Sequence, residues 1–509
     1  MWLLPFESAR RITTIIETFK GPQLPSTNLL RWQITVTDFD RMHPMAPQTT
    51  ALNSVQHPGE HTSNQLRSHL HSVEPVCLRT QTSSLAIIAR SSGSYHWTTE
   101  GRKLADFTSG VLVANLGHNM ASWWQKLAGY LELNLSEATD GKEFLSATPL
   151  TTYNAGCPIE VEASDRLLKS LQAEAGGQRM EQVLWAASGS EAVQKALWTC
   201  MARRPDSDMI LATRGGFHGK KGLSGAVTGS ETDAERDPRV RFISFPKEEC
   251  RSFQRRAQPI DLELYRNELQ QLANEFGDRL CCLITEPYLG GGGSFHPQPE
   301  YQQLLERFCR EHDIAYILDE IQANFGRTGS MYAFTHYGVE PDIVLLGKGL
   351  GNGIPVDAAV GRSDLFAGLG YGEGSDTWSG HPLGCAAVLA TLDEFESRQI
   401  VAGAIPLADA IQEGLIKLTE LPAVTAIRGE GTVWGVECAG IGDATASEIA
   451  MQAVEACYLG NAVGDAIHLL GPLAGSVIRI APPLNMPVDE ARHYLQVMYD
   501  ILATLPAAN

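Results

Sequence analysis

The feature that most constrains the fold is a regular alternation of short apolar runs with amphipathic stretches over residues 182–397. The apolar runs have the length of strands, and the amphipathic stretches are long enough for helices. The expected strands are 182–188, 208–214, 280–287, 314–320 and 342–349, and the expected helices are 191–204, 301–312 and 381–397. This alternation predicts an α/β fold, in which helices cover both faces of a mostly parallel sheet.

The first 74 residues differ in texture from the rest of the chain. They are rich in His, Ser, Thr, Pro and Gln, and we predict a poorly ordered extension there. Arg10, Arg11 and Lys20 are compatible with a mitochondrial presequence, whereas Glu7 and Glu17 count against one. We therefore expect a cytoplasmic protein, with mitochondrial import as the weaker alternative.

Composition excludes several classes of partner. The chain has 509 residues and a formal net charge of -19, which argues against nucleic acid as a partner because phosphate binding needs clustered Lys and Arg. No apolar run reaches the length of a membrane span. The 10 Cys are scattered and show no metal-ligand spacing, so we expect reduced thiols and no metal site.

Two of the expected strands end in residues that can carry chemistry. Asp319 and Glu320 close one strand, and Lys348 follows the next strand between two glycines, which permit close approach to a ligand. Taken singly, these features also fit a structural acid pair and a solvated loop lysine. In an α/β sheet, however, ligands bind beyond the carboxyl ends of the strands.

Together, the segments ITEP around Glu286, LDEIQANFGRTG around Asp319 and GKGLGNGIP around Lys348 closely resemble the class III aminotransferases, in order and in separation. The resemblance covers about residues 75–505 and implies the pyridoxal-phosphate-dependent transferase fold type I. It implies a large cofactor domain at 129–388 and a small domain combining 75–128 with 389–509. The implied activity moves an amino group between an amino donor and a keto acid or aldehyde acceptor, which are small-molecule substrates.

The resemblance also assigns roles around the cofactor, pyridoxal 5'-phosphate. Lys348 matches the Schiff-base lysine, which can then move a proton between the substrate α-carbon and the cofactor. Asp319 matches the acid that keeps the pyridine nitrogen protonated. Gln322 matches the side chain that bonds the phenolic oxygen, and Glu286 belongs to the same cofactor site.

The cofactor phosphate has two expected contacts. Gly189 and Ser190 lie where WAASGSEAVQKAL passes from a strand into a helix, and helix N-termini bind phosphate. The alternative for SGSE alone is an ordinary N-cap serine. Thr377, in GSDTWSGHPLG, matches a threonine that reaches the phosphate of the neighbouring subunit. The resemblance therefore implies a homodimer or a dimer of dimers.

Two further residues match positions beside the cofactor ring and the substrate. Phe217, in RGGFHGKKG, would stack on the pyridine ring, with a core position as the alternative. We expect its neighbour His218 to be structural rather than a catalytic base. Arg479, in SVIRIAPPL, would bind the substrate α-carboxylate, with an ordinary surface arginine as the alternative.

Some residues depart from the family pattern. Many relatives that use ω-amine donors carry a glutamate after the EP motif, whereas this chain has Gly291. The segment 457–484 and the preceding GVEC also resemble the dialkylglycine decarboxylase branch, which makes decarboxylation-dependent transamination the second hypothesis. A non-catalytic cofactor-binding protein is disfavoured because every position needed for chemistry is filled.

Overall fold

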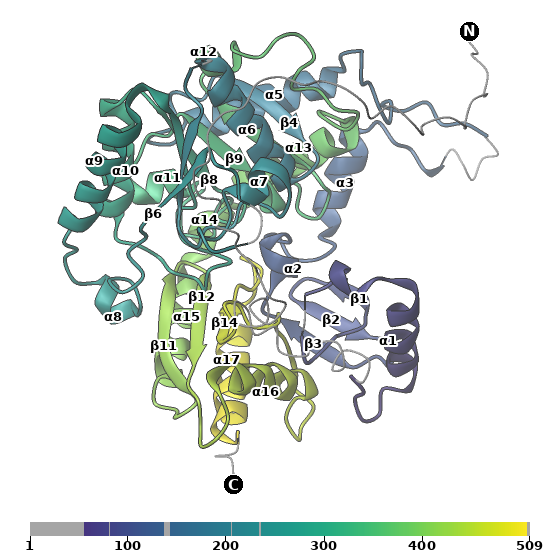
Figure 1. The fold of residues 1–509 in the computed structure, drawn as a ribbon. Coiled ribbons are helices and arrows are strands. Elements are labelled where there is room, and N and C mark those ends of the chain that lie inside the picture. Colours follow the sequence, from purple (N-terminus) through teal and green to yellow (C-terminus); the bar gives the residue numbers. More distant parts are fainter. Residues whose placement is uncertain (1–54, 81, 137–142, 205, 234–235, 506–509) are drawn as a thin grey trace, which may run out of the picture. The chain divides into compact units, whose positions relative to one another are not determined.

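The computed structural model describes residues 55–80, 82–136, 143–204, 206–233 and 236–505, and these form the predicted α/β architecture (Figure 1). The strands are β1 Ile88–Ser92, β2 Tyr95–Thr98, β3 Lys103–Asp106, β4 Gln182–Ala186, β5 Met209–Thr213, β6 Val240–Ile243, β7 Leu280–Thr285, β8 Ala315–Asp319, β9 Ile343–Leu346, β10 Asp357–Gly361, β11 Val424–Glu430, β12 Val433–Cys438, β13 Ile467–His468 and β14 Val477–Ile480.

The described helices are α1 His61–Val73, α2 Ser109–Leu112, α3 Ala121–Tyr130, α5 Pro158–Gln172, α6 Gly189–Arg203, α7 Gly222–Ala226, α8 Phe253–Arg256, α9 Glu263–Phe276, α10 Pro299–Glu311, α11 Ala333–Tyr337, α12 Ser363–Phe366, α13 Pro382–Arg398, α14 Ile400–Gly403, α15 Ile405–Leu418, α16 Ala446–Leu459 and α17 Val488–Ala503. None of them is long and apolar enough to cross a membrane. All the strands and helices expected over residues 182–397 are confirmed, with small shifts at their ends.

A seven-stranded sheet forms the centre, in the order β4-β10-β9-β8-β7-β5-β6. Its strands are parallel except β10, which runs antiparallel to both of its neighbours. Successive side chains point to opposite faces, so that Met209 and Leu211 join one core cluster while Ile210 and Ala212 join another. The first cluster includes residues of α5, α10 and α13, and the second includes residues of α6. The expected covering of both faces is therefore confirmed.

Two smaller sheets use strands that lie far apart in the sequence. One has the order β1-β2-β3-β13, and the other has the order β11-β12-β14. Both small sheets share one core with α15, α16 and α17, to which β3 contributes Ala105 and β13 contributes Ile467. The pairing of β3 with β13 joins the two ends of the sequence, as a small domain built from 75–128 and 389–509 would require. The domain boundaries themselves stay a prediction.

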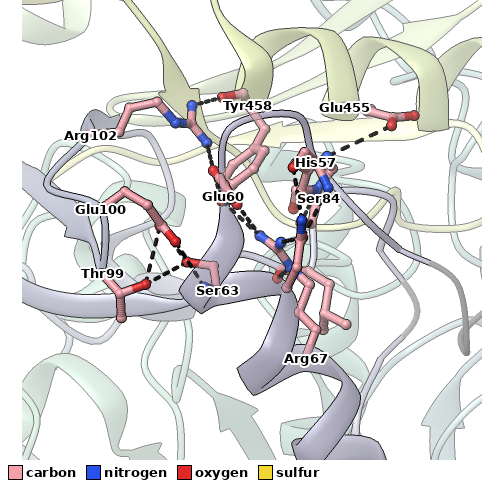
Figure 2. A network of polar contacts seen from close by, with 12 residues as sticks. His57, Glu60, Ser63, Arg67, Ser84, Thr99, Glu100, Arg102, Glu455 and Tyr458 are labelled. Atoms are coloured by element: carbon pink, nitrogen blue, oxygen red, sulfur yellow. Dashed lines mark hydrogen bonds and ion pairs between the residues drawn. The ribbon is translucent and has the colours of Figure 1, made fainter.

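One part of the expected extension forms a helix. Residues 1–54 lie outside the described residues, but α1 contains thirteen of the residues that we assigned to a poorly ordered segment. Figure 2 shows Glu60, directly before α1, between Arg67, Arg102 and Tyr458. Arg67 donates to Glu60 at 2.5 Å and the Tyr458 hydroxyl donates at 2.9 Å, while Arg102 forms a third contact.

The same network explains why the prediction of poor order, which rested on composition, was wrong for α1. Burial opposes the charge on Glu60, but hydrogen bonds from Arg67 and Arg102 hold the pKa of its carboxyl below the usual value. Ser63, also buried, donates to Glu100 at 2.6 Å. A polar composition is therefore compatible with order here, because these polar side chains are paired with residues of the turn between β2 and β3 and of α16.

Candidate active site

Three predicted residues meet at one edge of the seven-stranded sheet. Glu286 follows β7, Asp319 is the last residue of β8, and Lys348 follows β9 after one glycine. Because β7, β8 and β9 are neighbouring parallel strands, their carboxyl ends lie side by side. The fold therefore brings these side chains to the place where α/β sheets bind ligands.

Lys348 is held in an unusual backbone conformation. Its φ is 48°, in the left-handed region that residues other than glycine rarely adopt. The flanking glycines are required by space, since a Cβ on Gly347 would overlap the carboxylate of Asp357 and one on Gly349 would lie 2.5 Å from the amide of Asn115. Burial lowers the pKa of Lys348, and the nearby Asp319 and Asp357 oppose this shift. A lowered pKa favours the neutral, nucleophilic amine.

Asp319 is fixed by contacts to both carboxylate oxygens. Oδ2 lies 2.7 Å from Nδ1 of His218, and Oδ1 accepts a hydrogen bond from the amide of Ile321 at 3.1 Å. The side chain is buried. His218 therefore orients Asp319, which agrees with the expectation that this histidine is structural rather than a base.

Glu286 holds two loops together. Its carboxylate accepts hydrogen bonds from the amide of Phe217 at 2.9 Å and from the amide of Gly290 at 3.1 Å. Burial raises its pKa to about 7. The side chain of Phe217 is 46% exposed, so the alternative that it is a core residue is excluded. A Cβ on Gly291 would lie 3.1 Å from the Cβ of Phe217, so any side chain there would press on this ring.

The phosphate-site candidates lie at the start of α6. The helix begins at Gly189, and the N-cap Ser188 accepts a hydrogen bond from the amide of Glu191 at 3.3 Å. A Cβ on Gly189 would come within 2.9 Å of the side chain of Ile321, two residues after Asp319. Gly219, the residue after His218, packs against Ser190, because a Cβ built on Gly219 would lie 2.5 Å from the Ser190 hydroxyl oxygen. The helix N-terminus therefore borders the carboxylate site.

Arg479 projects from β14 toward the loop after β7. It is buried, and its Nη2 donates to the carbonyl of Gly290 at 2.8 Å. Burial lowers the pKa of this guanidinium, while Tyr288 and Glu286 nearby oppose the shift. The alternative of an ordinary surface arginine is thereby excluded.

Unsatisfied polar atoms indicate a ligand in this region. Gln322 Oε1, His218 Nε2 and Arg479 Nε are buried and have no hydrogen-bond partner among the described residues. Buried polar atoms are nearly always paired in folded proteins. Because His218 contacts Asp319 while Gln322 and Arg479 lie at Gly290, these three atoms could pair with polar groups of a bound cofactor such as pyridoxal phosphate.

Thr377 stands apart from the other predicted residues. Its side chain is exposed, in a loop that Asp376 ties to Lys195 of α6 at 2.6 Å. Within the described part of the chain, no hydrogen bond joins Thr377 to Lys348, Asp319 or Glu286. Its assignment to the phosphate of a neighbouring subunit stays a prediction.

Sequence reasoning missed Asp357. This residue begins β10, and its carboxylate lies beside Gly347 and within reach of Gly189. Burial raises its pKa to about 7, and Lys348 opposes the shift. No local signal could have indicated this, because β10 is the antiparallel strand that inserts between β4 and β9.

Solved structures share this fold. An amine transaminase from an uncultivated Pseudomonas species, in its PLP-bound form, has 26% sequence identity and a TM-score of 0.69 over 86% of this chain and 97% of its own. An ornithine aminotransferase from Toxoplasma gondii, at 22% identity, matches in fold with a TM-score of 0.71, covering 87% of this chain and 95% of that one. Fold and site together define a pyridoxal-phosphate-dependent transferase of fold type I.

The family follows from a match over most of the sequence. The class III aminotransferase model matches residues 77–502, and the chain therefore belongs to this family. An acetylornithine aminotransferase from Caldanaerobacter subterraneus subsp. tengcongensis is 27% identical over 439 residues, 82% of this chain and 95% of the relative. A 2-aminoadipate transaminase from Pseudomonas putida is 29% identical over 425 residues, 80% and 94% of the respective chains.

The protein is thus a pyridoxal-phosphate-dependent aminotransferase that moves an amino group between an amino donor and a keto acid or aldehyde acceptor. These comparisons do not support the decarboxylation-dependent alternative.

Proposed function

We propose that Lys348 holds the cofactor covalently and that Asp319, Gln322, Glu286, Phe217, Gly189 and Ser190 complete its binding site. When bound, pyridoxal phosphate supplies an electron sink for a carbanion at the substrate α-carbon. Asp319 holds a proton on the pyridine nitrogen, and His218 keeps its carboxylate in place through the 2.7 Å contact. The observation that carries this proposal is the meeting of Lys348, Asp319 and the start of α6 at one edge of the sheet.

Lys348 also moves the proton that transamination requires. With the cofactor bound, the freed amine of Lys348 would take a proton from the substrate α-carbon and deliver it to the C4′ carbon of the cofactor. This task needs a neutral amine near pH 7, and burial lowers the pKa of Lys348 in that direction. Asp357 and Asp319 oppose that shift and so limit how far the pKa falls.

Arg479 defines the substrate class in this proposal. The guanidinium is buried and makes one recorded hydrogen bond, to Gly290, while its Nε has no partner among the described residues. A buried cation left without an anion is costly. Gly291 offers no carboxylate to fill that role. We therefore propose that at least one half-reaction uses an amino acid or keto acid, whose carboxylate docks on Arg479 as a bidentate pair.

The orientation of that carboxylate favours transamination. The bond that breaks at the α-carbon is the one that stands perpendicular to the cofactor ring. A carboxylate docked on Arg479 would be held out of that perpendicular position, so its bond to the α-carbon would not be the one to break. Residues 290–293 are all glycine and supply no side-chain donor for a carboxylate turned the other way. The residues of this site thus support proton removal rather than loss of CO2.

Arg479→Ala tests the substrate assignment. We expect kcat/KM for a carboxylate donor to fall by about 100-fold or more, the scale of a lost charge-assisted pair of about 3 kcal/mol. A simple amine donor assayed with the same variant is the matched control, and its kinetics should change little. Equal losses for both donors would place Arg479 in a structural role, and unchanged kinetics for every carboxylate would remove it from the site.

The proposal extends to the assembly. Thr377 is exposed beside Trp378, which is 58% exposed, in a loop attached to the phosphate-site helix through Asp376 and Lys195. An exposed threonine and tryptophan next to a cofactor site suit contact with a second subunit. We therefore propose a homodimer, or a dimer of dimers, in which Thr377 serves the phosphate of the neighbour.

A further inference from the structure

A second cluster of ionisable side chains lies on the four-stranded sheet, among residues that the aminotransferase chemistry does not use. His96 pairs with Leu104 across β2 and β3, and His468 pairs with Asp106 across β13 and β3. Directly paired residues share a face of a sheet, as do residues two apart on one strand. His96, Asp106 and His468 therefore project from the same face of this sheet, whose strands β2 and β3 are labelled in Figure 1.

The third histidine of the cluster reaches this face from outside the sheet. His118 follows α2, and its backbone forms an isolated bridge with Gly93, with two hydrogen bonds of 2.9 Å. Its Nε2 lies 2.7 Å from Oδ2 of Asp106, and Nε2 of His96 lies 3.5 Å from the same oxygen. The ring of His96 is 4.5 Å from that of His118 and 5.2 Å from that of His468, between centroids.

We propose that His96 Nε2, Asp106 Oδ2 and His118 Nε2 bind a divalent transition-metal ion of the Zn²⁺ type. The three atoms lie within 4.8 Å of one another. Ligands that bind tetrahedral zinc at about 2.0–2.1 Å are about 3.3 Å apart, so small rotations of two imidazoles would complete the geometry. Two imidazoles and a carboxylate are a ligand set that zinc uses.

The surroundings already orient two of the ligands. The hydroxyl of Ser91 lies 2.7 Å from Nδ1 of His96, which turns Nε2 of this ring toward Asp106. Oδ1 of Asp106 accepts hydrogen bonds from the amide and the hydroxyl of Thr108, at 2.8 and 2.6 Å, so that Oδ2 faces the histidines. Outer contacts of this kind position the ligands of metal sites.

A fourth position and a path for the ion are also present. Nδ1 of His468 is buried and has no hydrogen-bond partner among the described residues, which makes it available to accept a hydrogen bond from a metal-bound water. The side chains of Asp106 and His96 are 0% and 7% exposed, whereas that of His118 is 17% exposed. An ion can therefore enter past His118. A neutral imidazole whose proton is on Nε2 moves that proton to Nδ1 by exchange with solvent, and a doubly protonated imidazolium releases one proton to solvent, as the metal–nitrogen bond forms.

Such a site could not be predicted from the sequence, because its ligands are far apart in the chain. They are separated by ten and twelve residues, on two strands and a connecting segment, and they form none of the short His and Cys spacings of common zinc motifs. Only the pairing of β2 with β3 and the return of His118 to Gly93 bring them together.

Zinc binding to the cofactor-loaded enzyme tests this assignment. Free cofactor is first removed, and Zn²⁺ is then titrated by equilibrium dialysis with elemental analysis. We expect one bound ion per chain, a rise in Tm on binding, and a visible absorption spectrum of tetrahedral nitrogen–oxygen coordination when Co²⁺ replaces Zn²⁺. His118→Ala and His96→Ala should lose the ion, and Ser91→Ala should bind it about 10-fold more weakly, as expected for a lost outer contact.

Two control variants separate this site from adventitious binding. His69→Ala and Cys77→Ser remove an exposed imidazole and the exposed thiol and should leave the bound ion and the Tm shift unchanged. If the ligand variants fail to fold, the Co²⁺ spectrum of the unmodified enzyme still decides. Absence of stoichiometric binding, a spectrum without nitrogen–oxygen coordination, or equal binding by His118→Ala would overturn the assignment and leave the cluster as a hydrogen-bonded network between β2, β3 and residue 118.

Discussion

Replacing Asp319 by Asn perturbs the proposed site with the smallest change in shape. The variant keeps an oxygen for the amide of Ile321, now 3.1 Å from Oδ1, but it loses the negative charge that faces His218 at 2.7 Å. The lost contact is a hydrogen bond to a charged group in a buried site, worth about 1.5–3 kcal/mol of folding stability. In the variant, the amide NH₂ of the new Asn would face Nδ1 of His218, which pairs with the Asp319 carboxylate in the unmodified protein. An NH₂ group can only donate there, so the proton of the His218 ring would have to move to Nε2.

The larger effect should fall on turnover. Removal of one preorganised electrostatic contact costs catalysis about 3–4 kcal/mol, or roughly 100- to 1,000-fold in rate. The assay is single-turnover kinetics of the amino-donor half-reaction, which isolates proton removal from product release. We expect the rate constant to fall by that factor while the cofactor stays bound.

A matched control is provided by the next residue. Glu320 is also a buried carboxyl, but its oxygens accept hydrogen bonds from the amides of Ala333 and Phe334 at 2.7 and 2.6 Å, away from Lys348. Glu320→Gln should therefore keep most of the turnover. Near-normal turnover in Asp319→Asn, or equal losses in the two variants, would refute the role given to the Asp319 charge.

Two further predictions concern stability and assembly. Burial raises the pKa of Glu320 from its ordinary value of 4.5 to about 8. The folded state therefore holds this proton more tightly than the unfolded state, which stabilises the fold fully below pH 4.5. This stabilisation is lost as the pH rises through 8. The unfolding free energy should therefore fall by roughly 2 kcal/mol more between pH 6 and 8 in the unmodified protein than in Glu320→Gln, as measured by urea titration; identical slopes would contradict this. For assembly, mixing Lys348→Ala with Thr377→Ala subunits should restore activity, because one site of the mixed dimer then carries neither lesion. No recovery despite proven subunit exchange would place Thr377 in its own chain's site.

The sequence predicted the elements around the cofactor well because each signal there is local. A strand, its terminal carboxylate or lysine and the adjacent glycines follow one another within ten residues, as at Asp319 and Lys348. The parallel order of β7, β8 and β9 then brings these local signals together. Such residues can be read from the sequence because chain order and spatial order coincide.

The residues that sequence reasoning missed depend on contacts between distant segments. Asp357 enters the site because β10 inserts antiparallel between β4 and β9, and contacts of Glu60 with Arg102 and Tyr458 tie the start of α1 to distant segments. The cluster of His96, Asp106 and His118 depends on strand pairing and an isolated bridge in the same way. Neither the composition nor the spacing of motifs in the sequence indicates which distant segments will pair.

The covalent attachment of the cofactor to Lys348 underlies every role proposed for this site. Its most direct test is borohydride reduction of the cofactor-loaded enzyme, followed by digestion and mass spectrometry of the labelled peptide. We expect a single label on Lys348 and none in Lys348→Ala. Lys195 is the informative competitor, because it is also buried but already contacts Trp185 O, Asp376 and Ser379 at 2.6–2.7 Å. Label on Lys195, or on any lysine other than Lys348, would contradict the account.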